Sequence, residues 1–145
     1  MTKIWLGIAL FSLSICAYAQ DWQPDYALAL TKAETTKKPL IVVFAGTDWC
    51  APCIKLDREV WQSETFKEYA KDHYVLYRAD FPRKKSNQLS QELILSNNLL
   101  AERFNPQGHF PLVLVIDSKE QVLGSTGYRK LPPEQYISLL NSFLK

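Results

Sequence analysis

Residues that could build a covalent or metal framework are scarce in this sequence. It has three cysteines, Cys16, Cys50 and Cys53, and two histidines, His73 and His109, among 145 residues. A small domain held together by disulfides needs more cysteines than these. A structural zinc site needs four ligands, and Cys50 with Cys53 would supply only half of them. The composition therefore speaks against a disulfide scaffold and against a zinc site.

A strong excess of one charge is also missing. Lys and Arg number 17 and Asp and Glu number 15, which gives a formal net charge of +2. Domains that bind nucleic acid and helices that lie on anionic membranes carry a clustered basic excess, so we expect neither kind of partner. No internal repeat, linker or low-complexity segment is present. With 47% hydrophobic residues, the chain suits one domain with a core of its own.

Long apolar runs are absent apart from one at the N-terminus. Lys3 precedes an apolar stretch over residues 4–15, and residues 17–19 read Ala-Tyr-Ala, a small-x-small cleavage pattern. The stretch is shorter than the about 20 residues that span a membrane. We therefore predict a cleaved signal peptide over residues 1–19 and a single domain over residues 20–145. The mature protein is expected in the periplasm or outside the cell.

Two other fates of the N-terminal segment stay open. Lipidation of Cys16 would make the protein a lipoprotein, although Ile15 stands where such sites usually have Gly, Ala or Ser. An uncleaved membrane anchor is the weaker alternative because the apolar stretch is short. If Cys16 is removed with the signal peptide, Cys50 and Cys53 are the only cysteines of the mature protein.

Apolar periodicity and turn residues divide the rest of the chain into helices and strands. Their order is helix, strand, helix, strand, helix, strand, strand, helix. This order predicts an α/β fold with a central mixed sheet of about four strands flanked by helices on both faces. The expected strands cover residues 40–44, 74–80, 112–116 and 121–125. One expected helix covers residues 26–36. Four more helical segments are expected to begin near residue 51, at Ser63, at Ser86 and at residues 132–133, and the helix from Ser86 is expected to be interrupted at Asn97-Asn98.

Cys50 and Cys53 lie where the first expected strand ends and a helix begins. A helix N-terminus has unpaired N–H groups and a partial positive charge, which lower the pKa of a cysteine there from about 8.5 to roughly 3.5–7. We therefore expect Cys50 to be the nucleophile. Cys53, one helical turn later, can attack a mixed disulfide formed on Cys50, and we expect it to be the more buried thiol. Pro52 suits the first turn because its missing N–H costs little there.

The sequence Trp-Cys-Ala-Pro-Cys over residues 49–53, after an apolar strand, resembles the active site of the thioredoxin superfamily, with alanine where thioredoxin has glycine. Three further stretches narrow the resemblance to small exported bacterial thioredoxin-like proteins. These are Phe-Ala-Gly-Thr-Asp-Trp-Cys at residues 44–50, Lys-Leu-Asp at residues 55–57 and Asp-Phe-Pro at residues 80–82. The resemblance covers nearly the whole chain after the signal peptide and implies a thioredoxin fold.

The resemblance also implies roles for residues around the two cysteines. Pro111 stands where such proteins have a cis-proline opposite the CxxC motif, although most X-Pro bonds are trans. Phe110 would offer main-chain hydrogen bonds to an extended, cysteine-bearing partner. Trp49 would shield the thiolate and contact the partner. Ala51 and Pro52, between the cysteines, complete the predicted substrate-binding set.

One feature of thioredoxin is missing. Thioredoxin has a buried aspartate about six residues before its first cysteine, which helps to move protons, whereas Val42, Val43 and Phe44 fill that region here. One more residue also separates Phe44 from Cys50 than in the corresponding thioredoxin stretch. We therefore expect the proton of Cys53 to pass to water when Cys53 resolves a mixed disulfide.

These features predict an exported thiol–disulfide oxidoreductase that requires no organic cofactor and no metal. Ala-Pro between the cysteines resembles the Gly-Pro of reductants, which favours a disulfide reductase over an oxidase or isomerase. In an oxidising compartment a reductase needs a membrane electron donor. Its expected substrates are cysteine-containing exported proteins, and we expect a monomer. The alternatives are a copper(I) chaperone that uses the two thiols and a redox-silent thioredoxin-like binding module.

Overall fold

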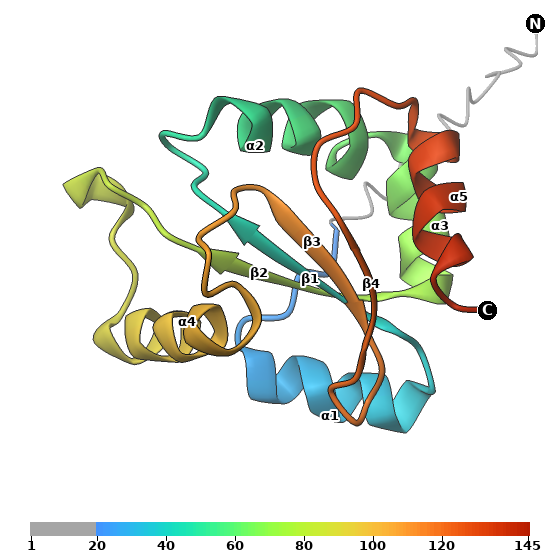
Figure 1. Cartoon of the computed structure of the whole chain (residues 1–145), viewed down its shortest axis with the longest axis horizontal. Helices are drawn as coiled ribbons and strands as arrows, with labels where there is room; N and C mark the ends of the chain where they lie inside the picture. Colours follow the sequence, from blue (N-terminus) through green and yellow to red (C-terminus); the bar gives the residue numbers. More distant parts are fainter. Residues whose placement is uncertain (1–19) are drawn as a thin grey trace, which may run out of the picture.

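The computed structural model describes residues 20–145. The predicted signal peptide and Cys16 lie outside the described residues. Figure 1 shows a sheet with helices on both of its faces. The strands are β1 (Leu40–Ala45), β2 (Val75–Asp80), β3 (Leu112–Ile116) and β4 (Val122–Thr126). The helices are α1 (Tyr26–Thr36), α2 (Ala51–Leu56), α3 (Glu64–His73), α4 (Gln91–Phe104) and α5 (Pro133–Ser142), with a π-helical turn η1 (Asp57–Trp61) after α2 and one 3-10 turn η2 (Lys85–Asn87).

The four strands form one mixed sheet in the order β2-β1-β3-β4. β1 pairs with β2 in parallel and with β3 antiparallel, and β4 forms an antiparallel hairpin with β3. Every residue of β1 is buried, as expected for a central strand that is covered on both faces. The predicted mixed sheet of about four strands is therefore confirmed.

The side chains of alternate β1 residues belong to two separate hydrophobic cores, one on each face of the sheet. Ile41, Val43 and Ala45 join the core that α2, α3 and α5 cover, whereas the residues between them join the core that α1 and α4 cover (Figure 1). The first core includes both Cys50 and Cys53. The CxxC motif is therefore backed by the main body of the protein.

Short polar side chains begin three of the helices. Asp25, Ser63 and Ser90 each accept a hydrogen bond from a backbone N–H in the first turn of α1, α3 and α4 respectively. Such N-caps stabilise a helix by about 1 kcal/mol. The predicted start at Ser63 is confirmed. Within residues 20–145, no helix has the length and apolar character needed to cross a bilayer.

The prediction for the segment around α4 is wrong in two details. Ser86 belongs to the 3-10 turn η2, and the helix begins only after Ser90. The expected interruption at Asn97 is absent because this side chain is buried and has polar partners. Asn97 accepts a hydrogen bond from the hydroxyl of Tyr77 at 2.5 Å and donates one to the C=O of Asp80 at 3.1 Å. These bonds to β2 offset the low helix propensity of asparagine.

Candidate active site

Cys50 and Cys53 lie beyond the carboxyl end of β1, where the chain enters α2 (Figure 1). They form a disulfide, and their Cα atoms are 5.2 Å apart. Cys50 is the N-cap of α2, with an extended backbone, and its Sγ accepts a hydrogen bond from the backbone N–H of Cys53 at 3.3 Å. A donor directed at this sulfur favours negative charge on it once the disulfide is opened. The predicted position of Cys50 at a helix start is confirmed.

The two cysteines are about equally buried in this disulfide-bonded form. Cys50 is 5% exposed and Cys53 is 4% exposed, and the expectation that Cys53 is the more buried residue once both are free thiols stays a prediction. Their neighbours do differ. Cys50 is followed by the exposed residues Ala51 and Pro52, whereas Cys53 lines a small cavity next to the sheet.

The turn before Cys50 is held against the end of β2. Thr47 donates from its N–H and its hydroxyl to the two carboxylate oxygens of Asp80, at 3.0 and 2.7 Å. The N–H of Cys50 donates to the C=O of Gly46 at 2.8 Å. Gly46 has no room for a side chain, since a Cβ there would lie 2.2 Å from the indole of Trp49. The turn therefore fixes both the first cysteine and the tryptophan before it.

Trp49, Phe81 and Phe110 form an aromatic wall next to this turn. The ring of Phe110 meets that of Trp49 edge-on at 5.4 Å between centroids and that of Phe81 at 5.5 Å. The indole Nε1 of Trp49 donates to the C=O of Phe81 at 2.7 Å. All three side chains are half-buried. The sequence had singled out Trp49 and Phe110, and the structure adds Phe81, whose ring packs on the ring of Phe110.

The peptide bond between Phe110 and Pro111 is cis, as the resemblance predicted. Pro111 directly precedes β3, whose first residue pairs with Phe44 near the carboxyl end of β1. Pro111 and Cys53 line the same small cavity. The structure therefore brings the predicted cis-proline to the same end of the sheet as the CxxC motif.

The lining of the cavity beside Cys53 includes an ion pair that sequence reasoning missed. Its volume is about 10 Å³, and its lining includes Asp57 and Arg78, whose Oδ1 and Nη2 atoms are 2.7 Å apart. Arg78 lies opposite Val43 in the register of β1 and β2. The carboxylate of Asp57, on η1, therefore lies in this region, although β1 contains no acidic residue. The spacing of four residues between Cys53 and Asp57 places both on one helical face and could have indicated that Asp57 lies near Cys53, but not that Arg78 pairs with it.

The carboxylate of Asp48 is engaged by the loop that follows β2. It accepts hydrogen bonds from the backbone N–H groups of Arg83 and Lys84 and from the side chain of Asn87, each at 3.0 Å. The bond from Arg83 is the main cause that holds the pKa of Asp48 below its ordinary value. Asp48 thus anchors this loop to the turn before Cys50.

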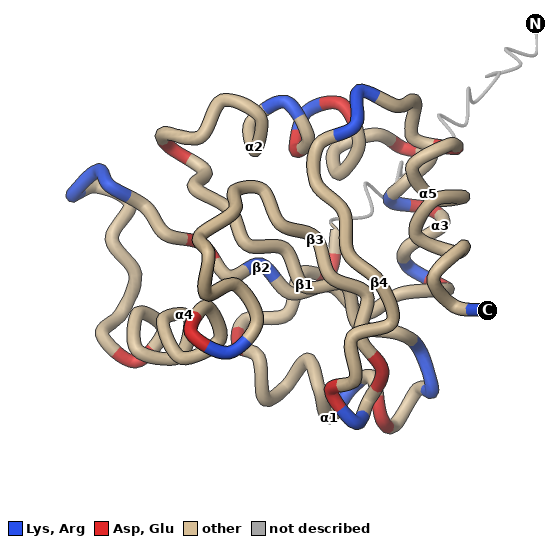
Figure 2. The backbone as a smooth tube through the Cα atoms, in the orientation of Figure 1, with Lys and Arg blue, Asp and Glu red and all other residues tan. Residues whose placement is uncertain are grey.

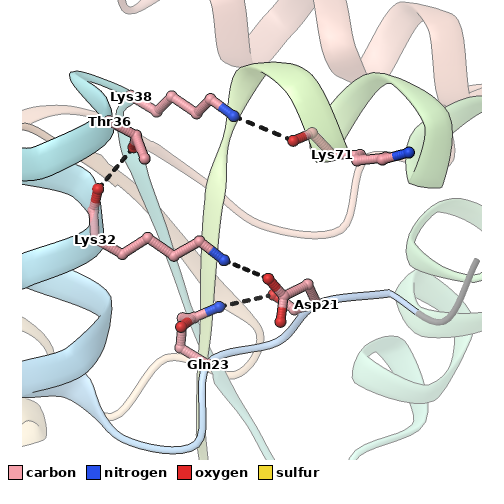
Figure 3. Close-up of polar contacts among 6 residues, drawn as sticks. All are labelled: Asp21, Gln23, Lys32, Thr36, Lys38 and Lys71. Atoms are coloured by element: carbon pink, nitrogen blue, oxygen red, sulfur yellow. Dashed lines mark hydrogen bonds and ion pairs between the residues drawn. The ribbon is translucent and has the colours of Figure 1, made fainter.

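A larger cavity, of about 370 Å³, is lined by residues of α1, α3 and β2. Figure 3 shows its polar contacts: Lys32 Nζ meets the carboxylate of Asp21, and Lys38 Nζ donates to the C=O of Lys71 at 3.2 Å. The described residues that line it include no cysteine and no histidine. Nowhere in residues 20–145 do three or more His, Cys, Asp or Glu side chains gather as metal ligands would. The candidate active site is therefore the CxxC end of the sheet.

Comparison with known proteins identifies the family of this chain. A family model described as thioredoxin-like matches residues 21–118. The chain belongs to the thioredoxin-like family. Disulfide bond reductase DsbH of Chlamydia pneumoniae is 33% identical over 131 residues, which are 90% of this chain and 76% of that protein. A solved structure of a DsbH oxidoreductase has a TM-score of 0.80 and 31% identity, over 96% of this chain and 94% of that one.

A second relative is larger than this thioredoxin-like protein. The thioredoxin-related protein DsbJ of Chlamydia pneumoniae is 26% identical over 106 residues, which are 73% of this chain but 30% of DsbJ. The likeness to DsbH confirms the predicted thioredoxin fold. With paired cysteines at the helix start of that fold, this thioredoxin-like protein is a thiol–disulfide oxidoreductase.

Proposed function

We propose that this protein is an exported disulfide reductase that acts on protein disulfides through Cys50 and Cys53. The observation that carries the proposal is Cys50 at the N-cap of α2, bonded to Cys53 one turn later. Two facts support the reducing direction: Ala-Pro lies between the cysteines, and a relative of 33% identity is named a disulfide bond reductase. Export is proposed from the Ala-Tyr-Ala pattern at residues 17–19, outside the described residues.

The reaction has two thiol–disulfide exchange steps. The Cys50 thiolate attacks one sulfur of a partner disulfide, so that a mixed disulfide forms and the second partner sulfur leaves as a thiolate that takes up a proton. Cys53 then loses its proton, attacks Sγ of Cys50 and releases the remaining partner thiol. The partner gains two electrons and two protons, and the protein ends with the Cys50–Cys53 disulfide. A membrane electron donor must reduce this disulfide before the next turnover.

Cys53 needs a proton acceptor in the second step, and we assign this role to Asp57. Its carboxylate lines the cavity that Cys53 also lines, and about 10 Å³ is the lower limit for one water molecule. A water there would connect the thiol to the carboxylate. Arg78 holds the carboxylate at 2.7 Å and so fixes its position. This assignment amends the expectation that the proton passes directly to solvent.

The partner chain is proposed to contact five residues around the cysteines. Ala51 and Pro52 are exposed between them, and the half-buried ring of Trp49 precedes them. Phe110 and Pro111 lie at the same end of the sheet, at the start of β3. An extended partner segment at this end could pair with the backbone of Phe110 while its disulfide reaches Cys50.

A redox titration together with a reduction assay tests the proposal. The chemically reduced protein should reduce insulin stoichiometrically, and the Cys50–Cys53 couple should have a potential near that of thioredoxin, about −270 mV. Cys50→Ser should abolish the reaction. A potential near that of the strong oxidant DsbA, about −120 mV, with oxidation of reduced substrates, would contradict the reducing direction. Tight copper(I) binding without any disulfide exchange would favour the chaperone alternative.

A further inference from the structure

The loop after β2 carries three consecutive cations, Arg83, Lys84 and Lys85. Residues 81–87, here called the basic loop, project from the body of the protein, and Figure 2 shows the cations at their tip. All three side chains are exposed. In the described part of the chain, no ion pair involves any of them. Their charge is therefore available to a partner.

The basic loop is fixed to the residues that lead into the active site. Asp48 accepts three hydrogen bonds from it, two of them from the N–H groups of Arg83 and Lys84. The guanidinium of Arg83 lies over the ring of Trp49, 3.8 Å from its centroid. Such a cation–π contact stabilises by about 0.5–1 kcal/mol at an exposed site. The backbone of the loop and the guanidinium of Arg83 are thus held next to the two residues that precede Cys50, so less entropy is lost when this loop binds a partner.

The charge around this entrance is unbalanced. Three cations lie near two carboxylates, those of Asp48 and Asp80, whose oxygens already accept hydrogen bonds. This leaves a local excess of one positive charge, in a sequence whose formal net charge is +2. The rest of the chain is therefore close to neutral, and the basic loop stands out as a charged feature beside the site.

We propose that the basic loop is an interaction surface for the disulfide-bearing partner and that it favours partners with carboxylates beside the reactive disulfide. This inference rests on the proposed function. A polypeptide that places a disulfide at Cys50 has its neighbouring residues within reach of a loop anchored at Asp48 and Trp49. Asp and Glu are the anions that such a polypeptide offers, and opposite charges at a rim raise the association rate.

Two other anionic partners fit less well. Segments that bind anionic lipid typically have four to eight clustered basic residues, and proteins that bind DNA make roughly 6–10 phosphate contacts. The basic loop has three cations. Its place beside the aromatic wall instead matches a partner that presents a polypeptide to the CxxC motif. An acidic protein segment is therefore the occupant to which the proposal commits.

The test compares synthetic peptides that share one internal disulfide and differ only in the residues flanking the cysteines, which are Glu, Ser or Lys. At low ionic strength, kcat/KM should be about tenfold higher for the Glu peptide than for the Lys peptide. At about 1 M salt, where the Debye length is about 3 Å, this ratio should approach one. Because all the peptides meet the same Cys50, a change in thiol reactivity cancels in the ratio.

The variants Lys84→Gln and Lys85→Gln together should reduce the Glu-to-Lys ratio to about twofold, because half of the electrostatic free energy or less remains. The matched control, Lys119→Gln with Lys145→Gln, removes two exposed lysines far from the CxxC end and should leave the ratio unchanged. A ratio of one in the wild type, or an undiminished ratio in the double variant, would overturn the proposal.

Three further measurements separate a failure of the proposed function from a failure of the charge preference. Reduction of 2-hydroxyethyl disulfide, which is small and uncharged, reports on the proposed function alone. If that activity is absent, fluorescence anisotropy with labelled Glu and Lys peptides whose cysteines are replaced by serine still tests the charge preference, and equal affinities would overturn it. Binding to vesicles that contain anionic phospholipid, lost in the double variant and without any peptide preference, would replace the proposal with a membrane surface.

Discussion

Two carboxylates flank the CxxC motif, and they differ in what they contact. Asp48, two residues before Cys50, accepts three hydrogen bonds from the basic loop at the surface. Asp57, four residues after Cys53, pairs with Arg78 at the cavity beside the sheet. Judged only by their distance from the cysteines along the chain, both carboxylates would be expected to repel a cysteine thiolate to a similar extent. Their partners distinguish them, because Asp48 holds the basic loop at the surface and Asp57 lines the small cavity that Cys53 also lines.

The largest effect on stability is expected from Gly46→Ala, in the turn that carries Asp48 at the surface. The new Cβ would lie 2.2 Å from the Trp49 indole, so the ring must leave its place against Phe81 and Phe110. Overpacking of this kind costs about 3 kcal/mol of unfolding free energy, measurable by urea denaturation. In a Trp49→Ala background the same change should cost much less, since the clashing ring is gone. Equal losses in both backgrounds would contradict the packing described here.

The next largest effect, on the rate of the second exchange step, is expected from Asp57→Asn at the cavity beside Cys53. Without the carboxylate the Cys53 proton must pass to solvent, so resolution of a mixed disulfide should slow about 100-fold at neutral pH, at the low end of the range for a general base. The rate of the variant should rise with pH over a range in which the wild-type rate is already level. Single-turnover kinetics across pH measure this. Asp48→Asn is the control and should leave the pH profile of this step in place; a shift of equal size in both variants would remove the distinction.

The smallest effect is expected for Asp48→Asn on stability. Hydrogen bonds hold the folded-state pKa of Asp48 below its ordinary value of 3.8. A carboxyl with a lowered folded-state pKa stabilises the protein above the unfolded-state value, and this contribution is lost as pH falls through the folded-state pKa. The Tm of the variant should therefore lie below that of the wild type at pH 7, and the two should converge below pH 3.8. A difference in Tm that does not change with pH would argue against a charged anchor. Asp72→Asn, on an exposed position of α3, provides the comparison.

The sequence was sufficient for features with a local cause. Apolar periodicity predicted the order of elements and the mixed sheet, and the position of Cys50 between a strand and a helix predicted its N-cap. The cis bond before Pro111 followed from the family resemblance. These features depend on residues close together in the chain or on a motif that is read directly.

The features that were missed depend on residues far apart in the chain. Arg78 lies 21 residues from Asp57, and Arg83 lies 35 residues from Asp48. Asn97 was taken as a helix interruption because its two partners, on β2, are not apparent from its neighbours. In each case a polar side chain takes its role from a contact that only the assembled sheet creates.

Covalent trapping tests most directly the claim that Cys50 attacks and Cys53 resolves. The Cys53→Ala variant, expressed with its own N-terminal segment, should accumulate mixed disulfides with partner proteins, because no internal thiol can release them. These complexes should appear as higher-mass bands on a non-reducing gel and disappear on reduction, and mass spectrometry would identify the partners. Cys50→Ala should trap far less. Equal trapping by both variants, or more by Cys50→Ala, would contradict the assignment of Cys50 as the nucleophile.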